Sequence, residues 1–176
     1  LTLVQEENLG GVVLTSQEVG GALNAIALSV LDAYRGGEDH GWVDAYAKAV
    51  AKGQDKAGAA WARHQAERSS GTRPSLPLAG YAGQYRDRWY GDMQISVEGR
   101  ALRLRFASTE QLTGRLEHWQ HDTFIVRWDD RSLNADAFVN FSLDPDGKVR
   151  DVRMQAISDL TDFSFDFQDL LFTPIP

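Results

Sequence analysis

The spacing of hydrophobic positions changes from helical to alternating at about residue 78. From Leu23 to Tyr34, apolar residues recur at i, i+3, i+4, i+7 and i+8, which predicts a helix of about three turns with one apolar stripe. Gly36 and Gly37 follow and indicate where this helix ends. Before it, the apolar run Leu9–Thr15 is bounded by glycines and predicts a buried strand.

The region from Asp39 to Arg68 is rich in alanine and lysine. Trp42, Tyr46 and Val50 fall on one helical face, and Trp61 follows among small residues, so we expect two short helices interrupted between Gly53 and Gly58. Small residues and prolines then dominate up to Pro77, a composition typical of a linker.

Downstream, apolar and polar residues alternate, beginning with Met93, Ile95 and Val97. Similar segments are Leu102–Phe106, Leu112–Trp119, Thr123–Trp128, Phe138–Leu143, Val152–Ala156 and Phe163–Phe167. A strong turn signal, Asp144-Pro-Asp-Gly147, separates two of them. The pattern predicts about eight short antiparallel strands, which remove their free edges by closing into a barrel. The fold class is therefore α+β, with an N-terminal strand and helices before the β-barrel.

Composition excludes several functions. The 176 residues are 43% apolar and 24% charged, as in an ordinary globular protein. The net charge of −7 and the lack of a basic stripe argue against a nucleic-acid partner. The absence of cysteine excludes disulfides, thiolate metal ligands and a cysteine nucleophile. No apolar run reaches the roughly 20 residues of a membrane span. Because the chain begins at Leu1 inside an apolar stretch, we expect it to continue a segment that has been removed.

The N-terminal region resembles a known enzyme family. Leu9-Gly-Gly-Val-Val-Leu-Thr-Ser16, followed by Gly20-Gly-Ala-Leu23 and a helix ending in Leu31-Asp-Ala-Tyr34, is similar to the last strand and closing helix of beta-lactamase-family (penicillin-binding) serine hydrolases. Ser16 departs from the asparagine common at that position of the family.

The C-terminal region resembles the lipocalin-like domain of unknown function often appended to those hydrolases. The matching segments are Leu78–Tyr85, Leu116–Phe124 and Phe141–Val149. The resemblance implies three parts: residues 1–37 as the last strand and helix of a truncated hydrolase domain, 38–77 as a helical connector and linker, and 78–176 as a lipocalin-like barrel.

The family's catalytic motifs are missing from this sequence. It contains neither S-x-x-K, nor Y-x-N, nor K-T-G or H-x-G, and without them serine activation and an oxyanion hole are lacking. The resemblance therefore implies a non-catalytic accessory domain without a cofactor, which shapes substrate access or oligomer assembly. Its expected partner is an upstream serine-hydrolase domain, and its expected compartment is the bacterial periplasm or another extracytoplasmic space. The apolar stripe of Leu23–Tyr34 is expected to dock on the barrel exterior or on a second copy, giving a homo-oligomer.

Two groups of side chains are candidate sites. His118, His121 and Asp122 form a polar cluster with residue types that bind divalent metals. However, alternation along a strand sends 118 and 121 to opposite faces, so we expect no metal there and expect His118 and Asp122 to cap a tight turn, with Trp119 and Phe124 in the core. A metal-dependent enzyme built on these histidines is the weakest hypothesis.

The second candidate site is the barrel interior. Tyr85, Trp119 and Trp128 are expected to line it. Small barrels of about eight strands either fill with side chains or hold one small ligand. An open interior would make the protein a lipocalin-like binder of a small apolar molecule, which is the alternative to the accessory role.

Overall fold

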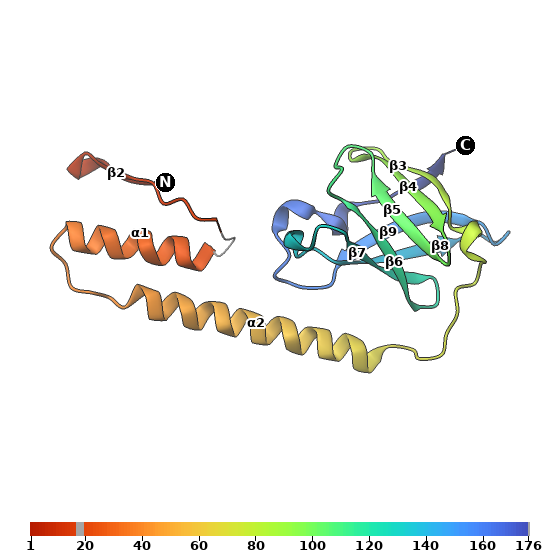
Figure 1. Cartoon of the computed structure of the whole chain (residues 1–176), viewed down its shortest axis with the longest axis horizontal. Helices are drawn as coiled ribbons and strands as arrows, with labels where there is room; N and C mark the ends of the chain where they lie inside the picture. Colours follow the sequence, from red (N-terminus) through yellow and green to blue (C-terminus); the bar gives the residue numbers. More distant parts are fainter. Residues whose placement is uncertain (17–19, 176) are drawn as a thin grey trace. The chain divides into compact units, whose positions relative to one another are not determined.

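The computed structural model describes residues 1–16 and 20–175, and the chain divides into two compact units (Figure 1). The first unit is Leu1–Gly58 and the second begins at Ala59. Two helices and a small hairpin make up most of the first unit. The second contains the end of the longer helix and an eight-stranded sheet.

The hairpin pairs β1 (Thr2–Val4) with β2 (Leu9–Gly11) in antiparallel fashion. The 3-10 turn η1 (Gln5–Glu7) connects them. The prediction of a buried strand over Leu9–Thr15 is wrong, since β2 stops at Gly11 and the following Val12 and Leu14 are 64% and 89% exposed. The physical reason is that a two-stranded hairpin has no second layer to bury a strand from both sides.

The first helix is confirmed: α1 runs over Gly20–Tyr34. It ends at the predicted glycines, where Gly36 adopts a φ of +64° and the amide of Gly37 donates to the carbonyl of Asp32 over 2.9 Å. These are the features of a Schellman cap, which needs a residue tolerant of left-handed backbone. Within α1, Ala25 alone is buried.

The second helix, α2 (Trp42–Glu67), is continuous over 26 residues. The predicted break between Gly53 and Gly58 is wrong. Neither glycine adopts a positive φ, and a glycine inside a helix costs only about 1 kcal/mol relative to alanine, which the alanines and lysines around it outweigh. Within the described ranges, none of the helices is both long and apolar enough to cross a membrane.

The sheet of the second unit has the order β10-β3-β4-β5-β6-β7-β8-β9, with every neighbouring pair antiparallel. The strands are β3 (Gly83–Asp87), β4 (Gly91–Glu98), β5 (Ala101–Phe106), β6 (Thr113–Gln120), β7 (Thr123–Trp128), β8 (Ala137–Leu143), β9 (Val149–Ala156) and β10 (Thr173–Ile175). Beside β10, Phe172 exchanges two backbone hydrogen bonds with Val152 of β9, of 2.8 and 3.0 Å. The sheet is thus a nearly closed barrel, which confirms the α+β class and the eight antiparallel strands.

One of the predicted strands is wrong. The alternating phenylalanines of Phe163–Phe167 lie in two 3-10 turns, η4 (Phe163–Phe165) and η5 (Phe167–Asp169), and the eighth strand is β10. The carboxylate of Asp162 accepts a hydrogen bond from the amide of Ser164 at 2.9 Å, and Asp166 has a φ of +41°. Side-chain caps of this kind offer the backbone an alternative to strand pairing.

Aromatic side chains fill the centre of the barrel. The ring centroid of Phe141 lies 4.9 Å from that of Tyr81 and 5.6 Å from that of Phe124. Toward Phe172, Phe106 packs edge-on at 5.5 Å. These are the edge-to-face geometries that aromatic pairs favour, and they hold the strands around one continuous core.

Candidate functional site

The polar cluster predicted at His118–Asp122 lies at the turn between β6 and β7. The Asp122 carboxylate accepts hydrogen bonds from the hydroxyl of Tyr81, from the amide of Ser75 (2.8 Å) and from the hydroxyl of Ser75 (2.7 Å). The amide of Leu76 donates in turn to the Tyr81 hydroxyl over 3.0 Å. Asp122 therefore binds the segment that precedes the barrel rather than capping its own turn.

Two further bonds attach the same segment. The amide of Ser69 donates to the side-chain oxygen of Gln120 over 2.7 Å, and the amide of His121 donates to the Thr72 hydroxyl over 3.0 Å. We call residues 69–76, Tyr81 and residues 120–122 together the β6–β7 latch. The composition of small residues and prolines does not predict this attachment, because the bonding partners are separated by 47 to 51 positions in the sequence.

The protonation states of the latch follow from its contacts. Burial raises the pKa of Asp122, but the hydrogen bonds from Tyr81 and Ser75 outweigh it and hold that pKa below its usual value. Burial, with the bond to Asp122 next in size, raises the pKa of Tyr81 to about 12. At neutral pH the pair is thus a carboxylate and a neutral phenol. Neither titrates near the pH at which a general acid or base is efficient, so the pair is suited to structure rather than proton transfer.

The two histidines are also engaged within the turn. Nε2 of His118 lies 2.9 Å from the carbonyl oxygen of His121, which places the ring proton on Nε2. The His118 ring also packs edge-on against Phe124, with centroids 5.5 Å apart. His121 itself has a φ of +45°, so its backbone makes the turn. Among the described residues, no three His, Asp or Glu side chains are grouped so as to hold a metal ion.

Two of the expected lining residues, Tyr85 and Trp128, lie in the barrel interior and are 2% and 1% exposed. Their polar atoms bind the protein itself. The Tyr85 hydroxyl donates to the carbonyl of Tyr81 over 2.7 Å, and the Trp128 indole donates to the carbonyl of Ala135 over 2.6 Å. This packing disfavours a free apolar cavity at these two positions.

Trp119, the third expected lining residue, packs outside the core cluster. Its ring lies 5.6 Å from Phe138, which pairs with Ile125 across β7 and β8, and 5.3 Å from Trp61 of α2. Arg68 covers it, with the guanidinium 4.5 Å from the ring centroid and Nε donating to the Trp119 carbonyl over 2.7 Å. The last turns of α2 therefore cover the outer face of the sheet here. The sequence signal is the run Phe124-Ile-Val126, which puts apolar residues on both faces of β7.

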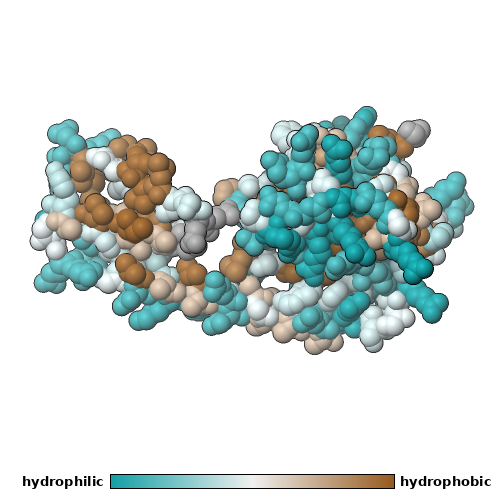
Figure 2. Space-filling view, viewed as in Figure 1, coloured by the Kyte–Doolittle hydropathy of each residue, from teal (hydrophilic) through white to brown (hydrophobic). Residues whose placement is uncertain are grey.

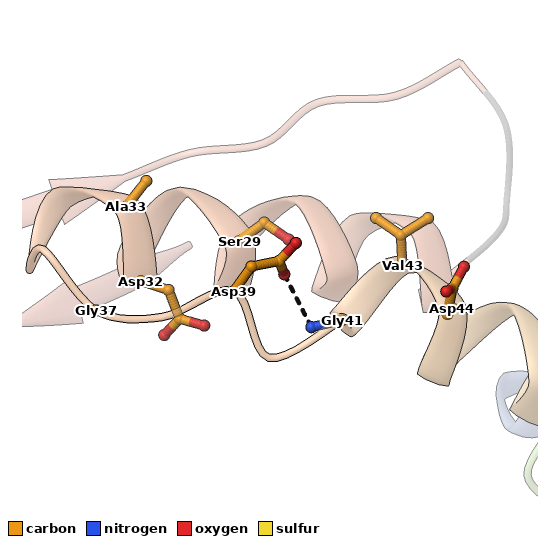
Figure 3. A pocket seen from close by; sticks show the side chains of 8 residues that line it. All are labelled: Ser29, Asp32, Ala33, Gly37, Asp39, Gly41, Val43 and Asp44. Carbon is orange, nitrogen blue, oxygen red and sulfur yellow. Dashed lines mark hydrogen bonds between the residues drawn. The ribbon is translucent and has the colours of Figure 1, made fainter.

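A surface hollow of about 420 Å³ lies in the N-terminal unit, and Figure 3 shows the residues around it. The Asp39 carboxylate accepts a bond from the amide of Gly41 over 2.8 Å. Asp32 accepts bonds from the Trp42 indole (2.6 Å) and from Nδ1 of His40 (2.8 Å), and the first of these is the larger cause of its lowered pKa. These carboxylates cap and join the ends of α1 and α2, a structural role.

Comparison with known proteins identifies the family. Residues 67–174 match the family described as "Domain of unknown function (DUF3471)", more than half of the chain, and the chain belongs to this family. This confirms the domain of unknown function that the sequence resemblance indicated.

A similar solved structure is the "Crystal structure of C-terminal domain of penicillin binding protein Rv0907", at 22% identity and a TM-score of 0.43, covering 61% of this chain and 93% of that chain. No curated protein matches the chain.

Proposed function

We propose that this chain is the non-catalytic C-terminal part of a beta-lactamase-family serine hydrolase in an extracytoplasmic compartment. Residues 1–37 supply the last strand and helix of the hydrolase domain, 38–77 form a connector, and 78–176 form an accessory barrel. Membership of the domain family, the sequence resemblance at both ends of the chain and the missing catalytic motifs support this proposal.

The observation that carries the proposal is the exposed apolar surface of the N-terminal unit. Leu3 of β1 and Leu14 after the hairpin are 66% and 89% exposed, and Val30 and Tyr34 of α1 are 62% and 60% exposed. Figure 2 shows hydrophobic residues gathered over this unit. A hairpin with a free edge and a helix with an uncovered apolar face fit a partner sheet that receives both.

The barrel's role in this proposal is to shape substrate access or assembly of the hydrolase. The test uses a longer polypeptide that carries this sequence after a serine-hydrolase domain, with and without the residues after Gly58. Both forms are assayed on D-amino-acid peptides, simple esters and beta-lactams, and both are weighed by sedimentation. We expect removal of the barrel to change the substrate range or the assembly size. If neither changes, the accessory role is refuted.

Substitution of two equally exposed valines distinguishes loss of docking through α1 from a general loss of helix stability. Val30→Asp on α1 is expected to destabilise the longer polypeptide but not the chain alone, because the side chain is already 62% exposed here. Val43→Asp on α2 is the matched control, since Val43 is also helical and 62% exposed. Equal effects of the two substitutions would contradict docking through α1. A dimer of the chain alone that Val30→Asp dissociates would instead favour a homo-oligomer through Leu23–Tyr34.

A further inference from the structure

Large apolar side chains are exposed to solvent on one part of the barrel surface. Trp89 and Phe163 are each 88% exposed, Leu160 is 55% exposed and Leu171 is 40% exposed. Trp89 lies in the turn between β3 and β4, and the other three lie in the segment 157–171 between β9 and β10. We call these four residues the aromatic rim. Scattered apolar residues are normal on a surface, but grouped large ones mark interaction sites.

The two segments that carry the rim are bonded to each other. The amide of Leu171 donates to the carboxylate of Asp87 over 2.8 Å. The hydroxyl of Tyr90, next to Trp89, donates to the carboxylate of Asp166 over 3.3 Å. The β3–β4 turn and the segment 157–171 therefore share one region of the barrel, although more than 70 residues separate them in the sequence.

The backbone under the rim is held by side-chain caps. The second oxygen of Asp87 accepts bonds from the amides of Trp89 (2.7 Å) and Tyr90 (2.9 Å), and Asp162 caps the amide of Ser164 at 2.9 Å. Rigid presentation of an aromatic side chain reduces the conformational entropy lost when a partner binds it. The backbone that carries Trp89 and Phe163 is thus held in place before a partner binds.

The phenylalanines of this segment divide between core and surface. Phe165 stacks on Phe167 at 5.5 Å, and Phe167 stacks on Trp128 at 6.2 Å. These two rings seal the barrel interior, whereas Phe163 points to solvent. Phe165 and Phe167 contribute to the core, whereas Phe163 does not. Burial against a partner would explain why a phenylalanine stands at this exposed position.

The charge around the rim selects the chemistry of the partner. Segment 157–171 contains four aspartates and no lysine, arginine or histidine, and in the β3–β4 turn the charge of Arg88 is offset by that of Asp87, so the rim as a whole is acidic. Cations are attracted to the faces of tryptophan and phenylalanine, and nearby carboxylates add to the attraction. We propose that the aromatic rim binds a polypeptide segment bearing arginine or lysine, with Trp89 and Phe163 stacking on the cationic side chains and the aspartates neutralising them.

The test is a titration of the full, ¹⁵N-labelled chain with tetra-arginine amide, followed through the five tryptophan indole N–H signals. Trp89→Phe assigns the signal of Trp89. We expect the peptide to shift this signal and to leave the indole of Trp128, 1% exposed, in place.

Trp89→Ala and Phe163→Ala should each weaken binding by about tenfold. Asp169→Asn, at an exposed carboxylate of η5, should weaken it less. Val97→Ala, 43% exposed on β4, is the control and should bind as the unaltered chain does.

Three results would overturn the proposal. The first is an unmoved Trp89 signal at millimolar tetra-arginine. The second is an equal shift with tetra-serine amide or with the neutral oligosaccharide cellohexaose, which would make the rim a general or a carbohydrate-binding surface. The third is unchanged binding in both alanine variants. Circular dichroism of each variant confirms that the barrel is intact, as expected for side chains that are 88% exposed.

Discussion

The indole of Trp61, on α2, lies against the indole of Trp119, on β6, with ring centroids 5.3 Å apart and planes inclined by 34°. Three residues further along α2, His64 packs edge-on against Phe138 at 5.3 Å. The family match begins only at residue 67, yet these contacts make the last turns of α2 a part of the barrel's packing. The helix covers apolar positions of the sheet that would otherwise face water.

Trp61→Ala should therefore destabilise the barrel unit. Removing a large aromatic ring from a packed site costs about 3–5 kcal/mol when it is fully buried, and because Trp61 is only partly buried we expect about 2 kcal/mol. Urea unfolding followed by circular dichroism measures the loss. Trp89→Ala is the matched control, the same substitution at an 88% exposed ring, and should change the unfolding free energy by less than about 0.5 kcal/mol. Equal losses would show that α2 does not support the barrel.

At Gly114 of β6 the backbone of the neighbouring strand β7 leaves no room for a side chain. A Cβ at this residue would lie 2.3 Å from the carbonyl oxygen of Arg127 and 2.9 Å from Cα of Trp128, both backbone atoms that cannot move aside. Gly114→Ala should thus cost about 3 kcal/mol or more, or prevent folding. Gly58→Ala is the control. Gly58 is exposed within α2 with open space around its Cα, and alanine there should stabilise the helix by about 0.5–1 kcal/mol. A well-folded Gly114→Ala variant of ordinary stability would contradict the close approach.

The alternating pattern predicts most of the barrel because the strands from β4 to β9, apart from β7, bury one face more than the other. It failed at Phe163–Phe167, where apolar alternation was present but Asp162 and Asp166 set the backbone into 3-10 turns. Alternation predicts which side chains face the core, but it does not predict the backbone conformation that places them there. In this segment the side-chain caps determine that conformation.

The candidate site was found in part. The sequence pointed to Asp122 as a residue that caps backbone, but not to Ser75 and Tyr81 as its partners, because such contacts depend on how the barrel closes. The alternating pattern of its strand predicts that Trp119 lies in the barrel interior. The register shift between His118 and Gln120 and the covering helix give it a different environment.

Chelation tests the assignment of the histidines. Nε2 of His118 is bonded to the His121 carbonyl and the Asp122 carboxylate to Ser75, so these atoms already have partners within the protein. We expect the same thermal midpoint with and without EDTA, and no shift on adding Zn²⁺ to the chelator-treated chain. A rise of several degrees with Zn²⁺, removed by His118→Ala, would instead reveal a metal site at this turn.

The Tyr81–Asp122 bond gives the latch a defined pH dependence. The pKa of Asp122 is lowered in the folded state, so its contribution to stability is present above the unfolded value near 4 and is lost as the pH falls through the folded value. The pKa of Tyr81 is raised from 10 to about 12, so its contribution is present below pH 10 and is lost as the pH rises toward 12. Tyr81→Phe removes a hydrogen bond to a charged carboxylate. Because the pair is partly exposed to solvent, we expect the free energy of unfolding to fall by only about 1–2 kcal/mol at pH 7.

Tyr85→Phe supplies the control for this pH dependence, because its hydroxyl donates to the Tyr81 carbonyl, which does not titrate. Urea unfolding free energies of both variants and the unaltered chain are compared at pH 7 and pH 3. The deficit of Tyr81→Phe should shrink at pH 3, which lies below the unfolded pKa of Asp122, because the unfolded state takes up a proton there and the stabilisation by the ionised carboxylate begins to be lost. The deficit of Tyr85→Phe should stay the same. If the losses of unfolding free energy in the two variants changed with pH in parallel, the charge of Asp122 would not be what Tyr81 stabilises. The latch would then be held by packing.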